Sequence, residues 1–170
     1  MYYRNSLDKY GECSARGENA ENAFIAVVKR KKIRYRDATI KEQFDHIDYV
    51  LEIDGKEVFL DVKARKKISR YDKGTADDKV WVEFKNVSGK NGWLHGSSNI
   101  IVFEREKDYV LVSRKKLLEY CENNIDKTNV VSEASNALYK LYTRHGRKDI
   151  ISMIKMEDLF LNMKPLIWKK

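Results

Sequence analysis

Apolar residues recur along the chain with two different periods, and the changes of period divide it into predicted elements. Residues 16–32 carry an apolar stripe at helical spacing that includes Phe24 and Val28, and they end in a basic turn that suits a helix C-terminus. Shorter runs that are rich in β-branched and aromatic residues predict strands. The predicted strands cover residues 33–40, 47–53, 58–62, 80–87, 100–104, 109–113, 138–143 and 150–154.

Two further helices are predicted in the second half of the chain. Ser113 is a suitable N-cap for a helix over residues 114–124, in which Leu117 and Cys121 share one face. Residues 156–163 predict a short closing helix. Helices and strands that alternate in this way predict an α/β fold, with a mixed central β-sheet flanked by helices.

The strongest local signal is the segment 46–67, which reads HIDYVLEIDGKEVFLDVKARKK. Asp54 and Gly55 separate two apolar runs and are typical of a tight two-residue hairpin turn. Counting outward from this turn places Asp48 opposite Asp61, with their Cβ atoms about 5 Å apart. Like charges at that separation repel each other, and a divalent cation bound between them would remove the repulsion.

The residues around this acidic pair suit phosphodiester hydrolysis. Lys63 lies on the same strand face as Asp61, because side chains alternate with period two. Asp48 and Asp61 could supply oxygen ligands to Mg²⁺ or Mn²⁺, with the backbone carbonyl of Val62 as a further ligand. Lys63 could position or deprotonate the attacking water. The alternative is an ordinary sheet face with an Asp–Lys ion pair, worth less than about 1 kcal/mol.

Two more acids are candidates for the same site. Glu21 lies at the margin of the apolar stripe of the first predicted helix, where an acid is usually excluded unless it is paired or binds a cation. Glu83 becomes a ligand or a water-binding group if its strand neighbours the hairpin. An ordinary surface position is the alternative for both. Glu18 is better explained by the helix dipole, and His46 by a hydrogen bond at a strand edge.

The charge balance favours a polyanionic partner. The chain has 34 Lys and Arg against 26 Asp and Glu, a formal net charge of +8, and its basic residues occur in clusters. A solvated surface is the alternative reading of any single cluster. The candidates for contact with nucleic acid are Lys66, Lys67, Lys85, Trp93 in a Gly- and Asn-rich loop, Arg144 and Arg147.

The bulk properties predict one domain over residues 1–170, since the chain contains one proline and no linker-like stretch. Its two cysteines are far apart, which argues against a zinc site or a disulfide framework and favours a reducing compartment. No stretch approaches the roughly 20 apolar residues of a membrane span, and the N-terminus does not resemble a signal peptide. We therefore expect a cytoplasmic protein that has no membrane partner.

Together these residues resemble the PD-(D/E)XK nuclease superfamily. Residues 17–21, GENAE, are similar to its helical Gly-x-x-x-Glu element, Asp48 to its first Asp, and residues 61–63, DVK, to its acid–x–Lys motif. Segments 81–103 and 142–149 are also similar to parts of small phage- and virus-borne nucleases of this superfamily.

The resemblance implies a restriction-endonuclease-like core and Mg²⁺-dependent cleavage of DNA, including Holliday-junction-resolvase-like roles in recombination, repair or restriction. It also implies a homodimer, since many such enzymes work as pairs. No proline precedes Asp48, which is a departure from many relatives. Because inactive members exist, a catalytically silent nucleic-acid-binding module stays open as an alternative, as does an RNA-cleaving relative.

Overall fold

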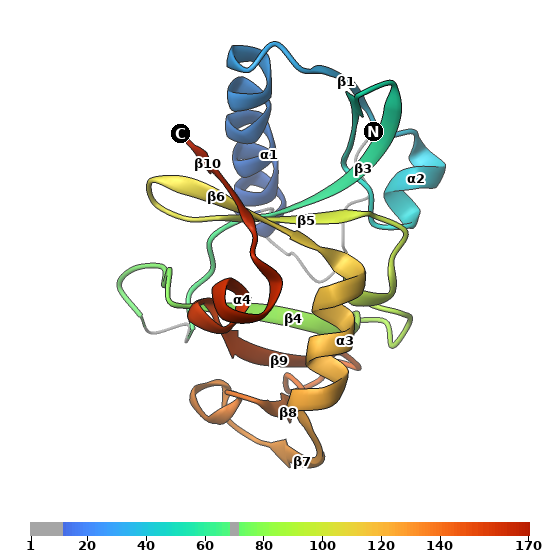
Figure 1. The fold of residues 1–170 in the computed structure, drawn as a ribbon. Helices are drawn as coiled ribbons and strands as arrows, with labels where there is room; N and C mark the ends of the chain where they lie inside the picture. The colour runs from blue at the N-terminus through green and yellow to red at the C-terminus, as the bar shows by residue number, and fades with distance from the viewer. Residues whose placement is uncertain (1–11, 69–71) are drawn as a thin grey trace.

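The computed structural model of the chain describes residues 12–68 and 72–170, and Figure 1 shows its arrangement. In chain order the elements are α1 (Glu12–Arg30), β1 (Arg34–Asp37), α2 (Ile40–Phe44), β2 (Tyr49–Ile53), β3 (Lys56–Lys63), β4 (Lys79–Lys85), the 3₁₀ turn η1 (Trp93–His95), β5 (Ile100–Glu104), β6 (Asp108–Ser113), α3 (Arg114–Asn124), β7 (Asp126–Val131), the 3₁₀ turn η2 (Ala134–Asn136), β8 (Lys140–Tyr142), β9 (Ile150–Lys155), α4 (Met156–Met163) and β10 (Leu166–Lys169).

The strands form two mixed sheets, so the α/β class is confirmed (Figure 1). The first sheet has the order β1-β2-β3-β5-β6-β10, and the second has the order β4-β9-β8-β7. Strands β3 and β5 are parallel neighbours. A parallel pair needs a crossover of a dozen residues or more. Here residues 64–99 make that crossover, and they contain β4, the first strand of the second sheet.

The sequence predicted one central sheet, whereas the structure has two. The strands predicted over 80–87, 138–143 and 150–154 form as β4, β8 and β9, but they lie in the second sheet. Their apolar residues indicate strands, whereas the identity of a neighbouring strand depends on tertiary packing that a local pattern does not contain.

Besides the two 3₁₀ turns, one short helix and two short strands were not predicted. Helix α2 begins at a capping box, in which Thr39 and Glu42 each accept a hydrogen bond from the other's backbone N–H. Strand β7 is exposed along nearly its whole length, and β10 is a four-residue edge strand. The predicted N-cap is confirmed, since the Ser113 side chain accepts from the N–H of Lys116.

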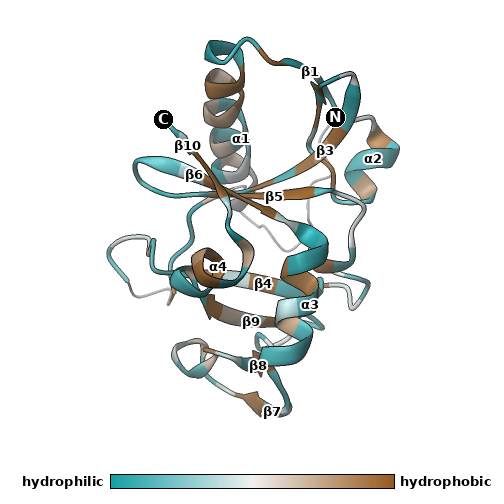
Figure 2. Ribbon diagram, in the orientation of Figure 1, coloured by the Kyte–Doolittle hydropathy of each residue, from teal (hydrophilic) through white to brown (hydrophobic). Residues whose placement is uncertain are grey.

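Helix α1 covers one face of the first sheet. The predicted apolar stripe is confirmed: Phe24 and Val28 are fully buried against a cluster that includes Leu60, Val62 and Val102. In Figure 2, β5 is largely brown and α1 carries brown turns among teal ones.

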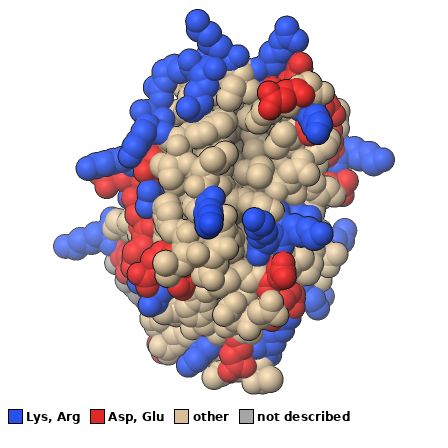
Figure 3. Space-filling model, in the orientation of Figure 1, with Lys and Arg blue, Asp and Glu red and all other residues tan. Residues whose placement is uncertain are grey.

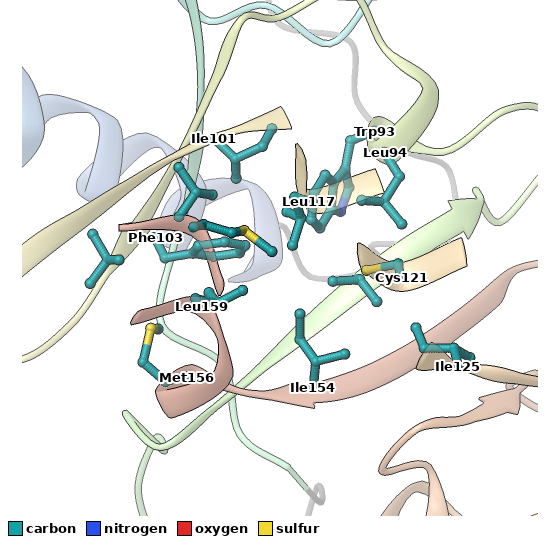
Figure 4. Close-up of a cluster of buried hydrophobic side chains, with 14 of the residues drawn as sticks. Trp93, Leu94, Ile101, Phe103, Leu117, Cys121, Ile125, Ile154, Met156 and Leu159 are labelled. Carbon is teal, nitrogen blue, oxygen red and sulfur yellow. The ribbon is translucent and has the colours of Figure 1, made fainter. Parts of the chain in front are cut away.

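The opposite face of the first sheet packs on the second sheet and on helices α3 and α4. Figure 4 shows part of this core, where Ile101 and Phe103 of β5 meet Leu117, Ile154 and other apolar residues. Asp61 and Lys63 of β3 pair in register with Ile101 and Phe103, so they lie on the same face. The predicted site is therefore at the margin of the core between the two sheets.

Among the described helices, none is both long and apolar enough to cross a membrane.

Candidate metal centre

The β2–β3 hairpin forms as predicted. Asp54 and Gly55 have φ angles of 51° and 71°, in the left-handed region that a two-residue hairpin turn of type I′ requires. The ladder follows the predicted register and ends at the Tyr49–Leu60 pair. Asp48 comes one residue before β2, where its N–H donates to the carbonyl of Leu60 at 2.8 Å. The turn thus sets the position from which Asp48 enters the site.

Asp48 and Asp61 bring their carboxyl groups together at this end of the hairpin. Asp48 Oδ2 accepts from the N–H of Val62 at 2.7 Å. Asp61 is only 1% exposed, and its Oδ1 lies 2.5 Å from Lys63 Nζ. Its Oδ2 is buried with no hydrogen-bond partner in the described part of the chain. Two ionised carboxylates have no proton to donate to each other, which leaves this oxygen orphaned.

Burial opposes the ionisation of both acids. The pKa of Asp48 is raised to about 7, first by burial and then by the charge of Asp61, while Lys63 acts in the opposite direction. Burial also raises the pKa of Asp61, again against the effect of Lys63.

Lys63, in contrast to the two acids, is stabilised in its charged form. Burial disfavours its ammonium group, but the carboxylates of Asp61 and Asp48 outweigh burial and hold the pKa of Lys63 above its ordinary value. Lys63 is therefore a cation at neutral pH. Of the two predicted roles, positioning a water or a phosphate fits this charge, whereas acting as a base does not.

Glu21 reaches the same centre from α1. Its pKa is raised to about 7, first by burial and next by the charge of Asp48, while Lys63 lowers it. These shifts mean that Glu21 lies within electrostatic range of both residues. The packing of α1 against β3 therefore brings Glu21 within range of Asp48 and Lys63.

Glu83 comes from the second sheet. Its charge contributes to the raised pKa of Asp61 and of Lys63, so Glu83 lies within electrostatic range of both, although β4 does not pair with the hairpin strands. Gly92 packs directly on Glu83, because a Cβ at Gly92 would lie 2.4 Å from the Glu83 carbonyl oxygen and 2.7 Å from its Cγ. Only glycine allows the following loop to pass this close to β4.

A turn over residues 92–96 closes one side of the centre. Lys63 Nζ lies over the ring of Trp93, 5.2 Å from its centroid, at the distance of a cation–π contact. On the far side of the turn, a Cβ at Gly96 would lie 2.8 Å from Cβ of His46. The two glycines thus let the turn fit between Glu83 and His46. The sequence showed these glycines, but their close approaches depend on tertiary packing.

His46 is held in a conformation that non-glycine residues rarely adopt, with φ of 59°. Burial, followed by the charge of Lys63, lowers its pKa, so the ring is neutral at pH 7. Its Nε2 lies 3.4 Å from the carbonyl oxygen of Asn91, as expected for a histidine that forms a hydrogen bond at the edge of a strand. Backbone strain of this kind, two residues before Asp48, is often found at functional sites.

The donor set fits a hard divalent cation. The buried, orphaned Oδ2 of Asp61 and the adjacent Asp48 carboxyl provide two oxygens whose repulsion a cation would relieve. No group of three or more His, Cys, Asp or Glu side chains that could hold a metal ion occurs within residues 12–68 and 72–170. Mg²⁺ usually keeps several waters and needs only one or two carboxylates, so a pair of Asp residues is sufficient.

The residues predicted to contact nucleic acid differ in how far they are exposed to solvent. Trp93 is only 4% exposed and packs edge-on against Phe103, with 6.1 Å between ring centroids, so its ring is not available for stacking on a base. Arg144 is half-buried, and its Nε lies 2.5 Å from the buried carboxylate of Asp149. The side chains of Lys66 and Lys85 are exposed, whereas those of Lys67 and Arg147 are half-buried.

The chain matches no protein-family model, no curated protein and no solved structure. Its function is therefore inferred from the chemistry of this centre.

Proposed function

We propose that this chain is a Mg²⁺-dependent nuclease that hydrolyses phosphodiester bonds of DNA. The observation that carries the proposal is the Asp48–Asp61 pair with its orphaned buried oxygen beside the ammonium group of Lys63. Two carboxylates that face each other without a donor are costly in a metal-free protein. A cation-binding role gives a reason for that cost, and the ion pair alone does not.

The order of the elements supports a restriction-endonuclease-like core. Glu21 is on the first helix, Asp48 enters the second strand, and Asp61 and Lys63 end the third strand. These are the places that the resemblance implies for the acids and the lysine. Strand β5, parallel to β3, completes a mixed sheet that α1 covers.

Each residue has a defined part in the proposed reaction. Asp48, Asp61 and the carbonyl of Val62 would hold the cation, with Glu21 binding one of its waters. When bound, Mg²⁺ polarises the phosphate and lowers the pKa of a bound water. Lys63, fixed by Asp61 and by the ring of Trp93, would orient the attacking water and offset charge on the phosphate.

The basic surface supports a nucleic-acid substrate. The net charge is +8, and residues 29–32, KRKK, are exposed at the end of α1. On the face drawn in Figure 3, Lys and Arg side chains gather over this end of the molecule, whereas along its rim they alternate with Asp and Glu. Such a surface attracts phosphates without reading sequence. A homodimer and a cytoplasmic location remain predictions from the sequence.

A panel of substrates tests the proposal. Supercoiled plasmid, single-stranded DNA, branched DNA and RNA are incubated with the protein in Mg²⁺ or in EDTA. Cleavage that needs Mg²⁺ and falls at least about a hundredfold in Asp61→Asn is expected, because the variant removes a ligand charge. Asp54→Asn, an exposed carboxylate in the same hairpin, is the matched control and should cleave normally. Absence of metal-dependent cleavage on every substrate would refute the activity.

A catalytically silent nucleic-acid-binding module is the second candidate. The observation in its favour is that the described residues contain no group of three potential metal ligands. Calorimetry with Mn²⁺ separates the two functions. Binding that disappears in Asp61→Asn supports the enzyme, whereas nucleic-acid binding without any Mn²⁺ binding favours the silent module.

A further inference from the structure

Two aromatic side chains meet on the second sheet, on the face turned away from the core between the sheets. Val82 and Phe84 of β4 belong to that core, so alternation puts Trp81 and Glu83 on the opposite face. Tyr142 of β8 shares this face, because Tyr142 and Glu83 both pair in register with Ile151 of β9. The rings of Trp81 and Tyr142 lie with 6.0 Å between centroids and a 40° tilt.

Both rings are held in place while part of their surface stays in contact with solvent. Trp81 and Tyr142 are half-buried, over the buried side chains of Met153 and Ile151. The Nε1–H of Trp81 donates to the carbonyl of Lys67 at 3.2 Å, which fixes the ring edge. Rings that are already ordered lose little conformational entropy when a ligand stacks on them.

This aromatic pair adjoins the candidate metal centre. Glu83, whose charge acts on Asp61 and Lys63, is two residues from Trp81 on the same face. Trp81 and Lys63 line one crevice, together with the cationic side chains of Arg65, Lys66, Lys79 and Arg105. Four of the cations that line the crevice pair with carboxylates, so a phosphate would share them with these acids: Lys63 with Asp61, Arg65 with Asp77, Lys79 with Asp78 and Arg105 with Asp108.

A second basic group lies at the other end of the pair. Tyr142 is followed by residues 143–149, TRHGRKD, whose one acid, Asp149, is buried and bound by Arg144. Lys148 of this loop packs beside Gly89, at 3.3 Å from the position of a Cβ there, so the loop adjoins the turn that carries Lys90. Basic side chains thus lie on both sides of the two rings.

We propose that Trp81 and Tyr142 stack bases of an unpaired nucleic-acid strand that leads away from the metal centre, with the two basic groups holding its phosphates. The assignment of this strand as substrate rests on the proposed nuclease function. Every base has a π-face, so stacking of this kind is tolerant of sequence, whereas a duplex keeps its base faces covered. The site therefore selects single-stranded, frayed or branched nucleic acid.

Affinity measurements in EDTA test the site independently of cleavage. The probes are fluorescein-labelled strands of dT and rU and a duplex, each about 20 nucleotides long, enough to span such a site. Trp81→Ala and Tyr142→Ala are each expected to weaken dT binding about tenfold, and Trp81→Phe and Tyr142→Phe less than about twofold. Duplex affinity should be unchanged. Equal binding of dT by wild type and both Ala variants, or an equal loss for duplex, overturns the proposal.

Tryptophan fluorescence gives a readout that loss of folding does not imitate. Stacking on dT should quench the emission of the wild type, and the quenching should shrink in Trp81→Phe while affinity is kept. Trp93, which is buried, and Trp168, which stacks on Phe24 of α1, remain in both proteins as the background. No quenching in the wild type overturns the proposal. Tighter binding of the rU strand with the same pattern of variants supports the site and assigns RNA as its ligand.

The two proposals fail separately. Metal-dependent cleavage by a wild type whose Ala variants bind dT normally keeps the nuclease and removes the stacking site. Aromatic-dependent binding of dT by a protein that cleaves nothing keeps the stacking site and removes the nuclease.

Discussion

The ammonium group of Lys63 lies 2.5 Å from Oδ1 of Asp61, whereas Oδ2 of the same carboxylate is buried with no partner in the described part of the chain. The two oxygens of Asp61 therefore have different surroundings. One is neutralised by an internal cation, whereas the other is buried without a hydrogen bond, so a second positive charge beside it would be favourable.

Replacing Lys63 by Met should lower turnover at least about a hundredfold while nucleic-acid affinity stays within about twofold, because the lysine acts on the reacting groups and its charge is already paired. Single-turnover cleavage and binding in EDTA measure the two quantities. Lys56→Met, an exposed lysine on the same strand, is the matched control. Unchanged cleavage in Lys63→Met would exclude Lys63 from the mechanism.

The free energy of unfolding in EDTA should fall as the pH rises from about 4 to about 8. The pKa of Asp48 is about 7 in the folded protein against an ordinary 3.8, so the folded state binds the proton more tightly. This stabilisation is complete below pH 3.8 and is lost as the pH rises through 7, by at most about 1.4 kcal/mol per pH unit. Glu21, whose pKa is also raised, acts in the same direction.

Urea unfolding of the wild type and of Asp48→Asn at pH 5 and pH 8 measures this effect. The variant should show a smaller pH dependence and be the more stable protein at pH 8, since it removes a buried charge. Added Mn²⁺ should stabilise the wild type more than the variant at pH 8. Parallel pH profiles of the two proteins would show that Asp48 ionises normally.

Gly96→Ala should destabilise the fold by about 1–3 kcal/mol and lower cleavage, because the new methyl group would overlap Cβ of His46, 2.8 Å away, and displace the turn that carries Trp93. Thermal unfolding and the plasmid assay measure both effects. Gly74→Ala is the matched control, since nothing lies within 4 Å of a Cβ there. If the two variants behave alike, the close packing of the turn is not required.

Nucleic-acid affinity should depend steeply on salt, because phosphate contacts release counterions. Each contact removed, as in Lys66→Ala or Lys85→Ala, should reduce the slope of log K against log salt by about 0.7 to 0.9. Titrations at several salt concentrations give the slope, and Lys56→Ala serves as a control away from the candidate crevice. A flat salt dependence would contradict binding led by phosphates.

The hairpin was predictable because its determinants are local. Asp54-Gly55 fixes the turn, the turn fixes the register, and alternation then places Asp61 and Lys63 on one face. The helical stripe that positions Glu21 is equally local. The second sheet was not predictable, since the partners of β4 are determined by contacts between residues far apart in sequence. Trp93 was misplaced for the same reason: a Gly-rich neighbourhood suggested exposure, whereas the core between the sheets buries the ring.

The crossover between β3 and β5 bears on the order in which the site forms during folding. Residues 12–63 contain Glu21, Asp48, Asp61 and Lys63. Glu83 and Trp93 lie in the connection between β3 and β5, which includes the first strand of the second sheet. Pairings between distant parts of a chain form slowly. We therefore expect Lys63 to gain its contact with Trp93 late in folding, and a protein shortened to its first sheet to lack both Trp93 and Glu83 beside the acids.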